Sequence, residues 1–99
     1  MYYAVYCTDT AEGTRLRQEH MDPHRAHIAS VADKLRLAGP CPATEGEARE
    51  ASLLVIEASS AAEVRAIMEA DPYFKAGVWE NVVVLPFRAL SGSWLPKKG

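Results

Sequence analysis

The sequence predicts an α+β fold, a ferredoxin-like βαββαβ arrangement with an antiparallel sheet. Three observations carry this prediction: runs of apolar, aromatic and β-branched residues, stretches with helical spacing between them, and Pro, Gly or Asp at the boundaries. The 99 residues can bury a small core without metals or disulfides. We therefore expect one domain over residues 1–99, with a core at 1–87 and a C-terminal tail at 88–99.

The first strand and the first helical region come at the start of the chain. Residues 2–8 are rich in aromatic and β-branched side chains, which indicates a strand, and residues 11–20 are polar with a helical pattern. Asp22 is predicted to cap a second helical stretch with Pro23 at its first position, where the missing N–H costs nothing. One stripe then recurs at helical spacing: His24, Ile28, Val31 and Leu35.

A short edge strand is predicted where this helix ends. Residues 35–38 are largely apolar, and the Gly-Pro-Cys-Pro stretch at 39–42 stops them. Because Pro flanks Cys41 on both sides, this strand cannot lie in the centre of a sheet. Residues 43–50 are small and charged, which indicates a loop.

The second half of the chain opens with a strand and a capped helix. Residues 52–58 are predicted to form a strand with apolar side chains on both of its faces, as a buried strand has. Ser60 and Glu63 fit the capping-box pattern, in which each side chain bonds the backbone N–H of the other. The following helix places three apolar residues on one face: Val64, Ile67 and Met68.

The end of that helix carries an acid that faces inward. Asp71 follows Ile67 by four residues, so it lies on the same face as the apolar stripe. Pro72 then starts a short turn, and Gly77 is a suitable C-terminal stop. Residues 79–87 form the last strand, with apolar side chains on both of its faces.

The predicted sheet has more apolar surface than two helices can cover. A half-exposed antiparallel sheet normally alternates apolar with polar residues, whereas the last two strands are apolar on both faces. The first strand adds Tyr2, Ala4 and Tyr6 on its second face. We expect a second copy of the chain to cover the open face and form a homodimer with a two-fold axis. An unknown partner or a flat apolar ligand is the alternative.

Composition and motifs exclude several classes of function. The net charge of −2 leaves no basic footprint for nucleic acid, and the apolar runs are too short to span a bilayer. The N-terminus lacks the basic region and the cleavage site of a signal peptide. We therefore predict a cytoplasmic protein with no nucleic-acid or membrane partner. Cys7 and Cys41 have neither CxxC nor zinc spacing and are expected to be structural.

An acid–base pair is the sharpest functional hypothesis. Asp71 sits among apolar residues, where a carboxylate needs a partner, although it could also serve only as the cap of the Pro72 turn. His24 projects from the inward stripe of the earlier helix. If the two meet, the carboxylate fixes one ring nitrogen and leaves the other to move protons. A core histidine bonded to backbone is the simpler interpretation. Arg17 lies either on a solvated face or beside the pair, where it could orient an anionic substrate.

Three histidines at helical spacing raise the question of a metal. His20, His24 and His27 are separated by four and three residues, and paired histidines of this kind occur in zinc sites. Pro23, however, is expected to break the helix between the first two, and no acidic or Cys ligand follows at metal-site spacing. The chain also contains no phosphate loop, dinucleotide fingerprint or nucleophile elbow. We expect no metal and no cofactor.

Several motifs carry a family resemblance up to Phe87. The segment DPYFKAGV at 71–78, followed by the strand end VLPF, is the most specific of them. Supporting segments are YCTD at 6–9, Arg17 followed seven residues later by His24, KLRLAGP at 34–40 and SLLV at 52–55. In these motifs the chain resembles the YciI-like (YCII-related) proteins. The resemblance implies a dimeric α+β barrel and an active-site His–Asp pair, which falls on His24 and Asp71.

One departure from the family pattern concerns the histidine. The family usually reads Arg-Pro-x-His-Leu, whereas this chain has MDPHR at 21–25, so Met21 stands where the arginine is expected. A shifted match would place the family histidine at His27. We prefer His24, because it keeps the spacing to Arg17 without gaps and lies on the apolar stripe.

Together these observations favour a cofactor-free small-molecule enzyme that transfers protons, similar to isomerases and lyases of the wider dimeric barrel group, whose monooxygenases are a further possibility. His24 would act as acid or base, and Asp71 would set its tautomer. Arg17, His27 and Tyr73 are the predicted substrate-binding residues, in a pocket between the sheet and the helices of a homodimer. The alternative is a non-catalytic ligand-binding or accessory module of the same family.

Overall fold

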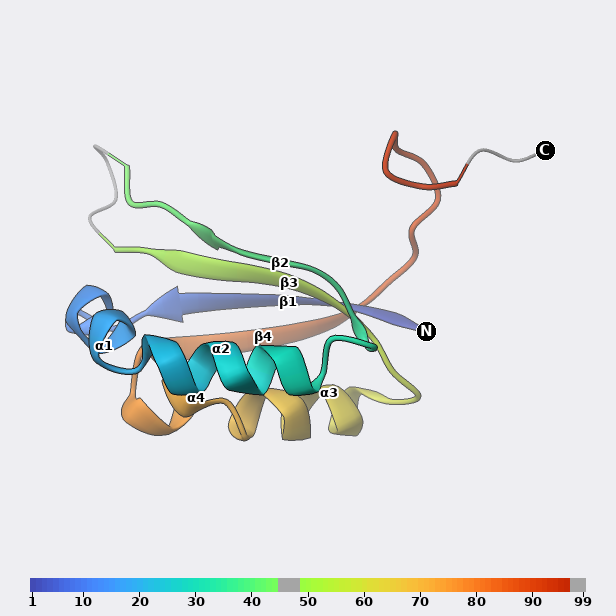
Figure 1. Cartoon of the computed structure of the whole chain (residues 1–99). Coiled ribbons are helices and arrows are strands. Elements are labelled where there is room, and N and C mark those ends of the chain that lie inside the picture. The colour runs from blue at the N-terminus through green and yellow to red at the C-terminus, as the bar shows by residue number, and fades with distance from the viewer. Residues whose placement is uncertain (45–48, 97–99) are drawn as a thin grey trace.

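The computed structural model describes residues 1–44 and 49–96; residues 45–48 of the predicted loop and 97–99 of the tail lie outside this description. The strands are β1 (Tyr2–Asp9), β2 (Leu35–Cys41), β3 (Ala51–Glu57) and β4 (Trp79–Phe87). The helices are α1 (Gly13–Glu19), α2 (Met21–Ser30), α3 (Ala61–Glu69) and α4 (Pro72–Ala76). Helices α2, α3 and α4 lie below the sheet in Figure 1, and α1 lies at its left-hand end. None of the helices within the described residues is long and apolar enough to cross a membrane.

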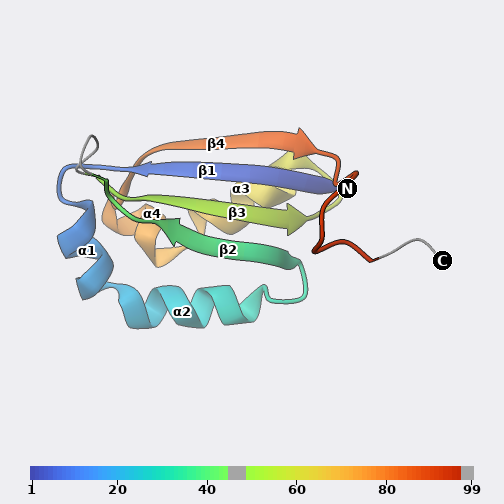
Figure 2. The same cartoon turned by 90° about the horizontal axis from the view of Figure 1, so that it is seen from above.

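The strands form one antiparallel sheet in the order β2-β3-β1-β4. Strand β1 is central, so that Val5 lies opposite Leu54 of β3 and Val84 of β4. Strand β2 lies at the edge, as its Pro pattern predicts, and α2 runs alongside it (Figure 2). This topology confirms the predicted ferredoxin-like α+β fold.

Helix α2 begins and ends earlier than the sequence pattern predicts. It starts at Met21, so Asp22 is not its N-cap and Pro23 is its third residue. Proline is tolerated there because the N–H groups of the first turn have no partner within the helix. The helix ends at Ser30, and Leu35, the last residue of the predicted stripe, belongs to β2 instead.

The start of α3 contains half of the predicted capping box. The Oγ of Ser60 accepts a hydrogen bond from the Glu63 backbone N–H at 3.2 Å, as expected. The Glu63 carboxylate, however, accepts from the backbone N–H and the hydroxyl of Ser59, at 3.1 and 2.6 Å, rather than from Ser60. Lys34 donates to the same carboxylate at 2.6 Å and ties the start of β2 to α3.

Glu63 gives the fold a defined response to acid. Hydrogen bonds from Lys34 and Ser59 lower the pKa of its carboxyl from 4.5 to about 2. Because the folded-state pKa is the lower one, this group stabilises the fold above pH 4.5, and the contribution is lost as the pH falls through 2. We expect Glu63→Gln to lower the free energy of unfolding at neutral pH, with a difference from wild type that shrinks in acid. Urea unfolding from neutral pH down to about pH 2 measures this difference in the free energy of unfolding. A difference that does not change with pH would contradict the lowered pKa of Glu63.

The core lies between the helices and the inner face of the sheet. Val5, Val64 and Val78 have no exposed surface there. Cys7 is buried among them as a free thiol, and burial raises its pKa to about 12. A neutral, buried thiol is a poor nucleophile, so Cys7 serves packing rather than chemistry.

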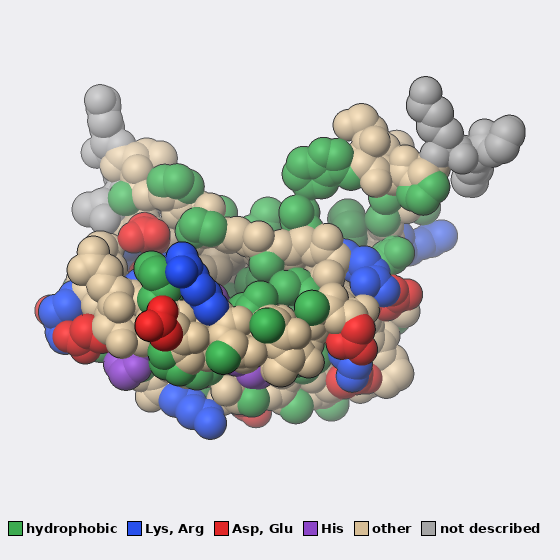
Figure 3. Space-filling view, viewed as in Figure 1, with side chains coloured by type: hydrophobic (Ala, Val, Ile, Leu, Met, Phe, Trp, Pro, Cys, Tyr) green, Lys and Arg blue, Asp and Glu red, His purple; other side chains and the backbone are tan. Residues whose placement is uncertain are grey.

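The other face of the sheet is an exposed apolar surface. Tyr6 lies opposite Leu53 of β3 and Val83 of β4, and the three side chains are 45%, 42% and 43% exposed. Figure 3 shows hydrophobic side chains gathered on this helix-free side. We call this surface the open face; by strand register it also includes Leu37, Val55, Leu85 and Phe87. An apolar patch of this kind is unusual on a monomeric protein.

Candidate active site

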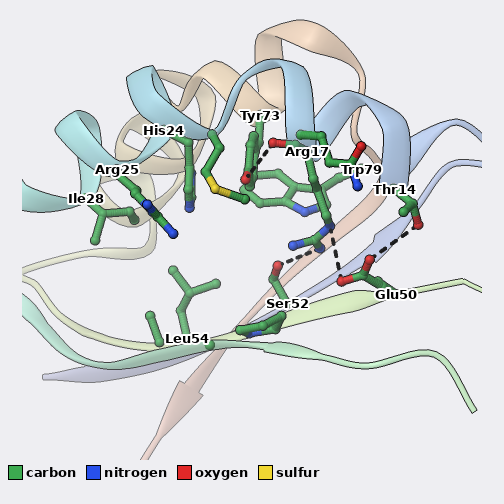
Figure 4. Close-up of a pocket in the computed structure, with 15 residues that line it drawn as sticks. Thr14, Arg17, His24, Arg25, Ile28, Glu50, Ser52, Leu54, Tyr73 and Trp79 are labelled. Carbon is green, nitrogen blue, oxygen red and sulfur yellow. Dashed lines mark hydrogen bonds and ion pairs between the residues drawn. The ribbon is translucent and has the colours of Figure 1, made fainter.

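A pocket of about 440 Å³ opens between the corner of α1 and α2 and the sheet edge formed by β2 and β3 (Figure 4). Arg17 and His24 line it from the helices, and Ser52 and Leu54 line it from β3. Tyr73 of α4 completes the wall. The predicted site residues Arg17, His24 and Tyr73 therefore share one cavity.

His24 and Asp71 are in direct contact at this pocket. The Nδ1 atom of His24 lies 2.8 and 3.0 Å from the two carboxylate oxygens of Asp71. The Asp71 side chain is 2% exposed and that of His24 is 21% exposed. A carboxylate can only accept, so Nδ1 carries a proton and the Nε2 atom of the neutral ring holds a free lone pair. Figure 4 shows the His24 ring with a nitrogen directed toward the cavity.

Asp71 is also the N-cap of α4. Its Oδ1 accepts a hydrogen bond from the Tyr73 backbone N–H at 2.9 Å, with Pro72 as the first helical residue. Gly77 ends the same helix in the left-handed region, at φ 82°, where glycine is favoured. The capping bond fixes the orientation of the carboxylate that meets His24. Asp71 therefore makes both contacts that the sequence suggests, because its carboxylate caps α4 and also bonds His24.

Tyr73 forms a flat wall against His24. The two rings are stacked with centroids 3.7 Å apart and an interplanar angle of 4°. The Tyr73 hydroxyl donates to the backbone carbonyl of Arg17 at 3.1 Å, which fixes the ring in place. Burial raises the pKa of Tyr73, so the phenol stays neutral at neutral pH. Its contribution to the site is therefore an aromatic surface beside the imidazole.

Arg17 is paired with a buried carboxylate. Its Nε and Nη2 atoms donate to the two oxygens of Asp9 at 2.7 Å each, and Nη2 also donates to Ser52 Oγ at 2.9 Å. Asp9 is 1% exposed and Arg17 is 8% exposed. Gly13 permits this arrangement, because a Cβ there would lie 2.5 Å from Asp9 Oδ2. Two of the three guanidinium nitrogens of Arg17 are thus paired within the fold, and its role in orienting a substrate anion stays a prediction.

The three histidines do not converge. The Nε2 atom of His27 lies 2.9 Å from the backbone carbonyl of Ile67, and His27 does not line the pocket. His20 is the residue that precedes α2, and its side chain makes no capping hydrogen bond. Within residues 1–44 and 49–96, no group of three or more His, Cys, Asp or Glu side chains is placed to hold a metal ion.

Most of the residues that line the pocket were not predicted as site residues from the sequence, and four of them carry polar groups that bear on its chemistry. Arg25, Glu50, Ser52 and Trp79 all line the cavity. The Nε1 atom of Trp79 is a buried donor without a hydrogen-bond partner among the described residues. Arg25 directly follows His24, at the position where the family pattern has Leu, and this departure is the signal in the sequence that could have identified it. Glu50 precedes β3, Ser52 lies in β3 and Trp79 begins β4, and nothing in their spacing along the chain marks them.

Comparison with known proteins places this chain in a family. Residues 1–88 match the YCII-related domain family. Protein YciI of Escherichia coli O6:H1 and that of Shigella flexneri are each 35% identical over 95 residues, covering 89% of this chain and 97% of theirs. An uncharacterized protein of Haemophilus influenzae is 30% identical over the same coverage.

A solved structure agrees with this assignment. The 5-chloro-2-hydroxyhydroquinone dehydrochlorinase TftG of Burkholderia phenoliruptrix AC1100, in complex with 2,5-dihydroxybenzoquinone, has a TM-score of 0.80 to this chain. The two are 25% identical, and the match covers 89% of this chain and 94% of TftG. The fold, the motifs and these relatives lead to one conclusion: the chain belongs to the YCII-related domain family.

Proposed function

We propose that this chain is a small-molecule enzyme that transfers protons without a cofactor, with His24 and Asp71 as its acid–base pair. The contact of Nδ1 with the Asp71 carboxylate carries the proposal, because it leaves Nε2 available as a base beside a pocket. A small oxygenated ring compound is the ligand class we favour. Its support is the likeness to TftG, a dehydrochlorinase whose structure holds a dihydroxyquinone.

Proton removal from a carbon next to a carbonyl is the reaction class that fits these groups. Nε2 of His24 takes the proton, the electrons of the C–H bond pass into an enolate, and the ring becomes an imidazolium. The Asp71 carboxylate and the stacked face of Tyr73 both stabilise that cation. Return of the proton to another carbon completes an isomerisation, whereas departure of a leaving group from the neighbouring carbon completes an elimination.

The test is a screen of small ketones, enols and hydroxyquinones in D₂O, with 2,5-dihydroxybenzoquinone among them. Proton NMR follows exchange of carbon-bound protons or loss of a leaving group. We expect enzyme-dependent exchange in at least one compound and its loss in His24→Ala. Exchange that is equal with wild type, with His24→Ala and without protein would contradict the proposal. Binding without exchange would favour a ligand-binding module instead.

We further propose that two chains pair through their open faces. Every strand of the described sheet contributes apolar side chains to the open face. Burying that surface is favourable by about 25 cal/mol per Å² of apolar area. A second copy presents the same apolar surface, which is the self-complementary condition of a two-fold interface. Pairing through the open faces would leave the pockets of both chains accessible, because each pocket lies on the helix side of its sheet.

Sedimentation checks the dimer. We expect a mass of about twice 10.8 kDa at micromolar concentration, and a monomer for Leu85→Lys, which places a charge on the open face. Phe74→Lys is the matched control, because Phe74 is also an exposed apolar residue, at 40%, but lies in α4 on the other side. A wild-type monomer, or equal dissociation by both substitutions, would contradict the proposed interface.

A further inference from the structure

The pocket contains two arginines in different electrostatic situations. Arg17 donates to Asp9 and Ser52 and is nearly buried, so its charge is already neutralised. Arg25 is exposed and forms no ion pair or hydrogen bond with any residue of the described ranges 1–44 and 49–96. The uncompensated positive charge of the pocket therefore belongs to Arg25.

Arg25 is positioned beside the proposed chemistry. It directly follows His24 on α2 and lines the pocket, and Figure 4 shows its guanidinium extending toward the cavity on the side of Leu54. Its charge is felt at Tyr73, where it opposes the rise in pKa that burial causes. Glu50 lines the same pocket but lies near Arg17, with its carboxylate 4.0 Å from the Arg17 Nε. The negative charge at the end of the cavity beside His24 is the buried Asp71 carboxylate, which bonds Nδ1 of His24, whereas Arg25 has no ion-pair partner among the described residues.

The buried indole of Trp79 does not add a second donor for a ligand. Its Nε1 has no hydrogen-bond partner among the described residues, but the atom has almost no exposed surface, so a ligand in the cavity does not reach it. The unpaired donor that the pocket wall offers to a ligand is therefore the Arg25 guanidinium.

We propose that Arg25 binds an anionic oxygen of the ligand, so that the pocket selects planar organic anions such as carboxylates, enolates or acidic hydroxyquinones. This inference rests on the proposed function and narrows its substrate class. A guanidinium pairs well with such oxygens, and a positive charge next to His24 also stabilises the enolate that forms when Nε2 takes a proton. The flat His24–Tyr73 stack and the apolar side chains of Ile28 and Leu54 contact the uncharged body of the ring.

The experiment compares an anion with its neutral analogue. The probes are 2,5-dihydroxybenzoquinone, whose hydroxyl groups are acidic, and 2,5-dimethoxybenzoquinone, which has no ionisable group. We expect the wild type to prefer the anion and Arg25→Gln to weaken binding of the anion about tenfold, with little change for the dimethoxy compound. Arg25→Lys should retain part of the preference. In the wild type the preference should decline between about 0.01 M and 1 M salt, where the Debye length falls from about 30 to 3 Å.

Arg88→Gln is the matched control, because it removes the same charge from an exposed arginine after β4 that does not line the pocket. It should bind both quinones as the wild type does. Equal weakening by Arg88→Gln and Arg25→Gln, unchanged binding in Arg25→Gln, or failure of the wild type to bind the anion would each overturn the inference. The proposed acid–base function is judged separately, by whether His24→Ala abolishes exchange.

Discussion

Asp71→Asn is expected to slow proton transfer in the pocket about 10²- to 10⁴-fold while the fold is retained. Asparagine is as good an N-cap as aspartate, so its side-chain oxygen can still accept from the Tyr73 backbone N–H. Its amide nitrogen, however, is a donor and would face Nδ1 of His24. The proton of the neutral ring then moves to Nε2, and the base that the mechanism needs is lost.

Asp22→Asn is the control for this substitution. Asp22 is also an aspartate followed by Pro, but it lies exposed in the first turn of α2 and, within residues 1–44 and 49–96, its side chain forms no hydrogen bond or ion pair. Its substitution should leave the rate unchanged. Exchange rates by NMR and melting curves by circular dichroism separate the two effects. Exchange at the wild-type rate in a folded Asp71→Asn protein would exclude Asp71 as the partner of a catalytic histidine.

Arg17→Met is expected to destabilise the fold by about 3–5 kcal/mol, the usual cost of leaving one charge of a buried pair without its partner. The Asp9 carboxylate is 1% exposed and receives both of its short bonds from Arg17. Asp9→Asn in the same chain removes the stranded charge without adding volume near Gly13, so the double variant should recover part of the loss. Urea unfolding measures each free energy.

Arg15→Met on the same helix provides the comparison. Arg15 forms ion pairs with Glu12 and Glu19, but its side chain is 57% exposed. Exposed pairs of that kind contribute little to stability, because water and salt screen the two charges. If Arg17→Met cost no more than Arg15→Met, the buried pair would not be the structural element described above.

The sequence predicts the fold well because its signals are local. Alternating apolar runs and the Pro residues near Cys41 indicate the strands and the edge position of β2, and the topology confirms both. The start of α2 is mispredicted because Asp22-Pro23 is compatible with the first turn of a helix at more than one position. The Glu63 carboxylate bonds Ser59 instead of Ser60, a choice between adjacent N–H groups that spacing cannot make.

The site is predictable only in part. Helical spacing places His24 and Asp71 on inward faces, and the family motif pairs them; their contact follows from the packing of α2 against α4. The Arg17–Asp9 pair escapes such reasoning, because it depends on the close approach that Gly13 permits at the end of β1. Arg25 and Trp79 reach the pocket from different elements, and only the assembled fold brings them together.

The tautomer of His24 tests the central claim most directly. Nitrogen NMR of the ¹⁵N-labelled imidazole rings across pH reports which nitrogen carries the proton when the ring is neutral. His27 is an internal reference, because its Nε2 faces the Ile67 carbonyl and must carry the proton. We predict the opposite tautomer for His24, protonated at Nδ1 in the wild type and at Nε2 in Asp71→Asn. A His24 ring protonated at Nε2 in the wild type, as in His27, would contradict the account.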